Sequence, residues 1–216
     1  MKRKREIIIH LHGFASSAHS AKAVRLKEWL ERVPYAEFMV PDFNPTPKDF
    51  EFLTVTGMLN RLRQYIVDHD IDQMNIIASS LGGLVALHYA ARFGKVKRLL
   101  LLAPVLSYGA LPFPDEMFVQ WKEGGSIAVP HYGFKEELLL RYDFHRDGLL
   151  YAAPVPPAAT MLILHGRNDA TIAIQNSRDY AATFSDQVTL VELDSDHALL
   201  DSLEIIGEHA ALFFLS

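Results

Sequence analysis

Ser80 lies in the segment whose residue types best fit a catalytic nucleophile. A short apolar run leads into it, and a segment with a helical pattern follows. A serine on such a strand-to-helix turn presents its hydroxyl to a substrate, provided that the residues two before and two after it are small. Ala78 and Gly82 occupy these two positions. The turn also places Ser80 at a helix N-terminus, where unpaired N–H groups favour negative charge. The alternative is a serine that only caps the helix.

Ser79 is the competing nucleophile. It would have Ile77 and Leu81 at the two flanking positions that require small side chains, so the pattern favours Ser80. A serine hydroxyl is a weak nucleophile until a neighbouring base accepts its proton, and a third group orients that base. The pattern therefore predicts nucleophilic acyl chemistry, and it requires a histidine and a carboxylate elsewhere in the sequence.

His197 and Asp169 are the residues that best meet this requirement. His197 follows the strand-like residues 188–193, and Asp169 lies in a polar turn after the apolar residues 161–164. Taken alone, the first could be a surface histidine and the second a turn-forming aspartate. Together with Ser80, however, each follows a different predicted parallel strand. All three are therefore expected at the carboxyl edge of one sheet, where ligands bind in open α/β folds.

Two backbone N–H groups are candidates to stabilise the negative oxygen of a tetrahedral intermediate. One belongs to Leu81, the residue after the predicted nucleophile. The other belongs to Phe14, because Gly13 directly follows the first apolar run and permits an unusual turn there. The alternative for this segment is an ordinary glycine turn at the end of a strand.

The elements that must position these residues alternate along the chain. Predicted strands cover residues 7–11, 38–40, 74–78, 99–103, 161–164 and 188–193. Predicted helices cover residues 20–32, 58–69, 82–93 and 199–215, with Gly94 as the C-cap of the third. Strands separated by helices favour right-handed crossovers and a parallel sheet. The sequence therefore predicts an α/β fold, a three-layer sandwich of about six mostly parallel strands with helices on both faces.

Residues 105–157 interrupt this alternation with many aromatic side chains, several prolines and no clear strand. We expect them to form a small cap insertion at one edge of the sheet, within a single domain over residues 1–216. Phe118 and Trp121 are candidates to line an apolar substrate pocket. An equally good interpretation is that the aromatic side chains only attach the insertion to the sheet.

Three cations in or near this segment could meet an anionic substrate group: Lys135, Arg141 and Arg146. Solvated surface charge is the commoner explanation for such residues. Elsewhere, His10 and His12 have the spacing of a metal-binding pair, but the residues that follow do not continue a known metal motif. No phosphate-binding or dinucleotide-binding glycine motif occurs in the sequence. We therefore expect no metal and no cofactor.

The segments discussed above resemble the signature of the α/β-hydrolase superfamily. The resemblance covers nearly the whole chain and rests on residues 12–14, the turn at Ser80, residues 165–169 and residues 196–197. The chain order Ser80, Asp169, His197 is that of the superfamily. The resemblance implies that these residues act as nucleophile, orienting acid and general base, with the amides of Phe14 and Leu81 as oxyanion donors. Within the superfamily the chain is similar to small bacterial esterases.

Two features depart from the superfamily pattern. Ala78 replaces the usual glycine before the nucleophile, and the loop at Gly13 has a single glycine where many lipases have a run. The second departure predicts poor hydrolysis of esters of bulky tertiary alcohols. We expect a serine esterase that cleaves small carboxylic esters, with short acyl or aryl groups, through an acyl-enzyme. The alternatives are a thioesterase or peptidase with the same three residues, and a catalytically silent binding module.

Composition excludes several other classes of protein. The chain has 216 residues, no cysteine and a net charge of -5, so it has neither a disulfide framework nor the positive charge typical of nucleic-acid binding. The basic residues 2–5 resemble the start of a signal peptide, but the apolar run after them is too short. No run approaches the length of a membrane span. We expect a cytoplasmic protein that binds a small ester and neither nucleic acid nor membrane.

Overall fold

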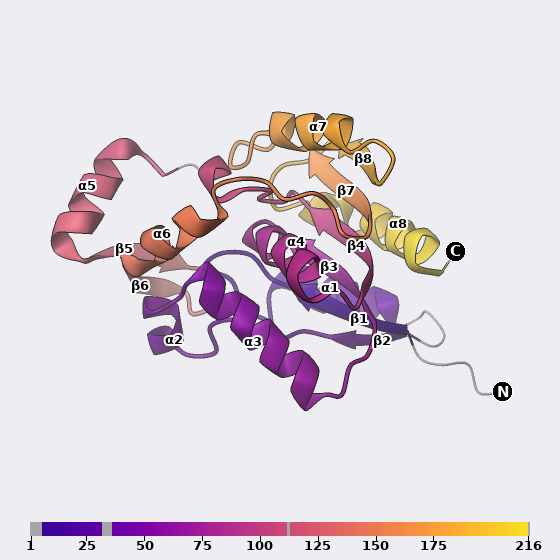
Figure 1. Cartoon of the computed structure of the whole chain (residues 1–216), viewed down its shortest axis with the longest axis horizontal. Coiled ribbons are helices and arrows are strands. Elements are labelled where there is room, and N and C mark those ends of the chain that lie inside the picture. The colour runs from indigo at the N-terminus through magenta and orange to yellow at the C-terminus, as the bar shows by residue number, and fades with distance from the viewer. Residues whose placement is uncertain (1–5, 32–35, 112, 216) are drawn as a thin grey trace.

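A six-stranded parallel sheet forms the centre of the computed structural model, which describes residues 6–31, 36–111 and 113–215 (Figure 1). The strand order is β2-β1-β3-β4-β7-β8. The strands are β1 (Glu6–Leu11), β2 (Ala36–Met39), β3 (Met74–Ser79), β4 (Val96–Leu102), β7 (Thr160–Gly166) and β8 (Val188–Leu193). All five strand pairings are parallel, as the sequence predicts. Residues 2–5, and the end of the helix expected over residues 20–32, lie outside the described residues.

Helices cover both faces of this sheet. On one face, α1 (Ala21–Leu30) and α8 (Leu203–Leu215) pack on Ile77 and its neighbours. On the other, α3 (Val55–Asp68), α4 (Leu81–Phe93) and α7 (Ile174–Thr183) pack on Ile76 and Ala78. Because successive strand side chains point to opposite faces and both faces are covered, the central strands are apolar without alternation. The expected three-layer sandwich is confirmed. Within the described residues, no helix combines the length and hydropathy needed to cross a bilayer.

Capping residues explain two differences from the predicted helices. α3 begins three residues before the predicted start, because Thr54 caps it by accepting a hydrogen bond from the Gly57 N–H group. The short helix α2 (Pro47–Glu51) was not predicted at all. It is held by reciprocal hydrogen bonds between Thr46 and Asp49, which form a capping box. Its length gives too few residues for a helical pattern of apolar side chains to be visible.

Residues 105–157 contain a β-hairpin, so the expectation of no clear strand was wrong. The segment forms η1 (Tyr108–Ala110), α5 (Asp115–Gly124), β5 (Ser126–His131), β6 (Glu136–Arg141), α6 (Asp143–Gly148) and η2 (Leu149–Tyr151). β5 and β6 pair antiparallel. The alternation in β6 is hidden in the sequence by three consecutive leucines, of which Leu138 and Leu140 are buried and Leu139 is exposed. Both strands of this two-stranded hairpin are edge strands, so Pro130, which has no N–H group to donate, is tolerated in β5.

The hairpin lies against the loop that follows β1. Tyr132 lies in the turn of the hairpin, and its backbone N–H group donates a hydrogen bond of 2.9 Å to the Ala15 carbonyl. A Cβ atom on Gly133 would lie 2.9 Å from the Cβ of Ser17, which shows how closely the two loops approach. β6 also packs on α2. The insertion therefore lies next to the carboxyl end of β1, at the left of the view in Figure 1.

Candidate active site

Ser80 occupies a strained backbone conformation between β3 and α4. Its φ angle is 50° and its ψ angle is -120°, in a region that residues with a side chain rarely adopt. Three backbone hydrogen bonds hold it there. Its N–H group donates to the Leu102 carbonyl at 3.0 Å, and its carbonyl accepts from the N–H groups of Gly83 and Val105 at 2.8 and 3.0 Å. β4 and the segment after it therefore stabilise the turn.

Gly82 shows why the residue two after Ser80 must be small. A Cβ atom at this position would lie 2.5 Å from the carbonyl oxygen of Leu11 and 2.8 Å from that of His12. No side chain can occupy that space without moving the backbone that follows β1. The first turn of α4 therefore approaches β1 closely, and this contact brings the loop after β1 next to Ser80.

The structure brings Ser80, His197 and Asp169 into one chain of hydrogen bonds. Nε2 of His197 lies 3.1 Å from Oγ of Ser80, and its Nδ1 lies 2.7 Å from Oδ2 of Asp169. Because a carboxylate only accepts hydrogen bonds, Nδ1 carries the proton and the lone pair of Nε2 points at the serine hydroxyl. The three residues come from the loops after β7 and β8 and from the turn after β3.

Asp169 is a fully hydrogen-bonded carboxylate. Its Oδ1 accepts from the backbone N–H groups of Thr171 and Ile172, each at 2.8 Å. Its Oδ2 is shared by His197 and by His165, whose Nε2 lies 3.0 Å away. Burial alone would raise the pKa of Asp169, but the hydrogen bonds from His165, His197 and the Ile172 N–H group outweigh it and hold the pKa below its ordinary value. The residue is therefore ionised at neutral pH.

His165 is a site residue to which the sequence analysis gave no role of its own. Its ring is fully buried, and Nε2 lies 3.0 Å from both Oδ2 of Asp169 and the carbonyl of Ile172. Two acceptors require a proton on Nε2, so the Ser177 hydroxyl donates to Nδ1 at 2.8 Å. His165 thus fixes the Asp169 carboxylate. The available signal was a polar residue at the end of an apolar strand, four positions before the predicted acid.

The amides of Phe14 and Leu81 make no hydrogen bond within the described part of the chain. Nδ1 of His12 donates to the Gly13 carbonyl at 3.0 Å, which fixes the peptide between Gly13 and Phe14. In a trans peptide the N–H group points opposite to the carbonyl, so His12 also fixes the direction of the Phe14 N–H group. A Cβ atom on Gly13 would lie only 3.2 Å from that of Ser80, so this peptide is beside the nucleophile.

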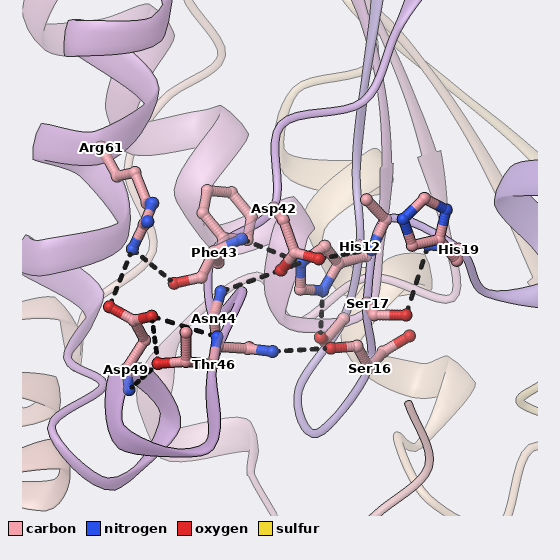
Figure 2. A network of polar contacts seen from close by, with 12 residues as sticks. His12, Ser16, Ser17, His19, Asp42, Phe43, Asn44, Thr46, Asp49 and Arg61 are labelled. Carbon is pink, nitrogen blue, oxygen red and sulfur yellow. Dashed lines mark hydrogen bonds and ion pairs between the residues drawn. The ribbon is translucent and has the colours of Figure 1, made fainter. Parts of the chain in front are cut away.

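A polar network holds His12 itself in place (Figure 2). The backbone N–H group of Phe43 donates to Nε2 of His12 at 3.1 Å. Asp42 lies beside the same ring, and its carboxylate accepts from the N–H groups of Ala18 and Asn44 at 3.1 and 2.9 Å. The segment after β2 thus holds the loop after β1 through hydrogen bonds. These hydrogen bonds keep the Gly13 peptide in one orientation.

A cavity of about 540 Å³ opens onto Ser80 and His197. Neither aromatic candidate of the sequence analysis is among the residues that line it. Trp121 is completely buried, and its Nε1 donates to the Leu140 carbonyl at 2.8 Å. Phe118 packs on other aromatic rings of the insertion. The expectation that these two side chains line the pocket therefore fails for this cavity, because Trp121 is buried inside the insertion and the partly buried Phe118 packs on its rings.

Other residues line the cavity in their place. Tyr132, in the hairpin turn, is the part of the insertion that reaches it. Arg141 and Arg146, two of the cations considered for an anionic substrate group, instead form ion pairs with Asp143 at 3.4 and 3.3 Å. The cation that does line the cavity is Lys22, which the sequence analysis did not single out.

Comparison with known proteins places the chain in a family. A sequence model of the Uncharacterised protein family (UPF0227) matches residues 7–213. The chain belongs to this family. Alpha/beta hydrolase domain-containing protein 10 from mouse has a similar structure, with a TM-score of 0.76 and 21% identity over 100% of this chain and 93% of that one.

Two further solved structures are similar. Est1E from Butyrivibrio proteoclasticus with ferulic acid bound has a TM-score of 0.78 and 20% identity, over 98% of this chain and 89% of that one. A monoacylglycerol lipase from Paleococcus ferrophilus has a TM-score of 0.74 and 16% identity, over 98% of this chain and 95% of that one. These likenesses confirm the α/β-hydrolase fold that the sequence resembles.

Proposed function

We propose that the protein is a serine hydrolase that cleaves small carboxylic esters through an acyl-enzyme. The observation that carries the proposal is the hydrogen-bonded chain from Ser80 through His197 to Asp169. Its serine lies on a strained turn beside the free amides of Phe14 and Leu81. Each part has a role in acyl transfer, whereas a binding module needs none of them.

The geometry supports the following first half of the reaction. Oγ of Ser80 attacks the ester carbonyl carbon while Nε2 of His197 takes the hydroxyl proton. The Asp169 carboxylate stabilises the imidazolium that forms. The carbonyl oxygen becomes negative and is stabilised by the N–H groups of Phe14 and Leu81. When the intermediate collapses, His197 gives the proton to the departing alkoxide, and the alcohol leaves an acyl group on Ser80.

The second half repeats these steps with water. His197 takes a proton from the water as its oxygen attacks the acyl carbonyl carbon, and the same two amides stabilise the new oxyanion. Collapse breaks the bond to Ser80, and His197 returns the proton to its Oγ atom. The carboxylic acid is released and the enzyme regains its starting state. No group other than these residues, the ester and water enters the balance.

The cavity favours small substrates. Its volume of about 540 Å³ lies within the ordinary range of small-molecule sites, roughly 300–1,000 Å³. The hairpin turn that borders it is attached to the loop after β1 through Tyr132 and Gly133, so a long acyl chain would have to displace this contact. The similar structures include one with an aryl acid bound and a monoacylglycerol lipase, which supports testing both aryl and acyl esters.

A substrate screen with two serine variants tests the proposal. Wild-type protein is expected to hydrolyse p-nitrophenyl esters of short acyl chains and small aryl esters faster than thioesters or amino-acid arylamides. Ser80→Ala is expected to lower kcat by roughly 10⁴–10⁶-fold while the protein melts at the same temperature. Ser79→Ala is the matched control and should retain most activity towards these uncharged esters. Faster turnover of thioesters or arylamides would replace the ester assignment, and retained activity in Ser80→Ala would overturn the mechanism.

A further inference from the structure

Lys22 lines the same cavity as Ser80 and His197 but has no role in the reaction derived above. It is the second residue of α1, whose first turn contains no acidic side chain. A cation is unfavourable at a helix N-terminus, where the helix dipole is already positive. The side chain is also partly buried, which disfavours the charged form. Local structure therefore gives no reason for a lysine at this position.

Among the described residues, no carboxylate is in contact with the ammonium of Lys22. Burial lowers its pKa to about 8, and the more distant charges of Asp196 and Asp169 only partly oppose this effect. Within the described residues, Lys22 forms no ion pair, in contrast to Lys27 on the same helix, which lies 3.9 Å from Glu31. At pH 7 the cavity wall thus carries a positive charge that is available to a ligand.

Two polar groups near this side of the cavity are also free. The Ser79 hydroxyl is buried, lines the cavity and has no hydrogen-bond partner in the described part of the chain. His10 donates from Nδ1 to the Ile77 carbonyl at 3.2 Å, and its Nε2 is an acceptor with no hydrogen-bond partner among the residues that the structure describes. Ser79 lies two residues after Ile77 and so projects from the sheet face that α1 covers. Lys22, Ser79 and His10 therefore border the same side of the cavity.

We propose that this side of the cavity binds a carboxylate group of the substrate, so that the preferred esters carry a negative charge. The Lys22 ammonium neutralises the carboxylate and the Ser79 hydroxyl donates a hydrogen bond to it. The lone pair on His10 and the carboxylate of Asp196, which also lines the cavity, favour a monoanion over a doubly charged phosphate. This inference rests on the proposed ester hydrolysis and adds its substrate class.

A matched pair of esters tests the subsite. The mono-p-nitrophenyl ester of glutaric acid carries a carboxylate, and the p-nitrophenyl ester of glutaric acid monoamide is its neutral counterpart of the same size. Wild type is expected to prefer the charged ester by roughly 10- to 100-fold in kcat/KM, mainly through KM, as for a hydrogen bond to a charged group. Lys22→Met should abolish this preference, and Lys22→Arg should keep most of it.

The control variant is Lys27→Met, which removes a charge from the same helix outside the cavity lining and should retain the wild-type preference. The proposal is overturned if wild type shows no preference or if Lys22→Met keeps it. It is also overturned if a p-nitrophenyl ester bearing a phosphonate shows the Lys22 dependence in place of the glutarate ester. A merely structural role for Lys22 would lower the melting temperature and affect both esters alike.

Binding to the Ser80→Ala variant separates this proposal from the proposed function. By calorimetry, the charged ester should bind Ser80→Ala at least roughly tenfold more tightly than the monoamide ester, and adding Lys22→Met should remove the difference. If wild type hydrolyses neither ester but this difference persists, ester hydrolysis fails and the subsite stands. If wild type hydrolyses both esters but Ser80→Ala binds them equally well, the proposed ester hydrolysis stands and the carboxylate subsite fails.

The binding difference should also depend on pH. The groups that face Lys22 are His10 in β1 and the aspartates Asp169 and Asp196 in the loops after β7 and β8. Burial lowers the pKa of His10 to about 3, and Asp169 is ionised well below neutrality, so neither changes charge between pH 7 and 9. Lys22 loses its proton as the pH rises through about 8. The preference of Ser80→Ala for the charged ester should therefore fall from pH 7 to 9, and a constant preference would contradict the assignment.

Discussion

At the carboxyl edge of the sheet, each candidate catalytic residue follows a different parallel strand and is held by hydrogen bonds, whereas the aromatic side chains of residues 105–157 pack mainly on one another. Asp169 accepts four hydrogen bonds. Trp121, by contrast, is buried inside the insertion. Among the described residues of the insertion, Tyr132 is the one that lines the cavity, and Phe113 and Phe144 pack on the ring of Phe14 beside it. The difference suggests that polar residues at the sheet edge carry the chemistry, while most aromatic residues stabilise the insertion.

The largest expected effect tests whether Asp169 alone orients the base. The carboxylate that the structure places in contact with the His197 ring is that of Asp169, whereas Asp194 accepts from the Asn168 side chain and Asp196 from backbone N–H groups in its own loop. Asp169→Asn is expected to lower kcat by roughly 10⁴-fold, because the amide no longer enforces the required tautomer of His197. Steady-state kinetics with His197→Ala provides the reference, and Asp194→Asn, which changes a carboxylate outside the cavity lining, is the control. A much smaller loss in Asp169→Asn would show that another acid takes over.

A smaller effect is expected at His165, which positions Asp169 without touching the substrate. His165→Leu removes a hydrogen bond to the carboxylate and should lower kcat by roughly 10- to 100-fold with little change in KM. His165→Gln can still donate from an amide nitrogen and should restore much of the rate. If both variants lose stability equally and keep the wild-type kcat, His165 is a packing residue of the core and nothing more.

The smallest effects on activity are expected in the insertion, and they separate its two kinds of aromatic residue. Trp121→Ala should destabilise the protein by about 3–5 kcal/mol, because it empties a buried site, while the dependence of kcat/KM on acyl-chain length stays unchanged. Tyr132→Ala should leave the stability nearly unchanged and alter the dependence on acyl-chain length, since Tyr132 is 80% exposed and borders the cavity. We expect it to shift the optimum by a few carbons towards longer acyl groups.

Thermal unfolding and a series of p-nitrophenyl esters measure both properties of these two variants. A changed chain-length profile in Trp121→Ala would return the buried aromatic residues to the list of pocket candidates. An unchanged profile in Tyr132→Ala would mean that the hairpin turn does not limit the size of the acyl group.

The site residues that could be predicted from sequence are those that come directly after the end of a predicted strand. Ser80 was predicted because its neighbours are small, and the contact between Gly82 and the backbone after β1 explains that requirement. Asp169 and His197 were predicted because each directly follows a different predicted parallel strand. The sheet itself was predicted because strand-like and helix-like segments alternate along the chain, and because its central strands, covered on both faces, are apolar.

The missed residues depend on packing between segments far apart in the chain. Lys22 reaches the cavity only because α1 packs on the sheet face below Ser79, and a lysine in a helix otherwise indicates a solvated surface. His12 fixes the Gly13 peptide only because Phe43, thirty-one residues later, donates to its ring. Tyr132 reaches the site through a hairpin whose leucines hide the alternation. No short sequence pattern carries such information.

The most direct test of the central claim is to find which atom reacts with a fluorophosphonate. The wild-type protein should be labelled once, and mass spectrometry of its peptides should place the label on Ser80. Ser79→Ala should be labelled at the same residue, and His197→Ala should react far more slowly, because nothing then accepts the hydroxyl proton. A wild-type protein that is folded but remains unlabelled, or a label on Ser79, would contradict the account.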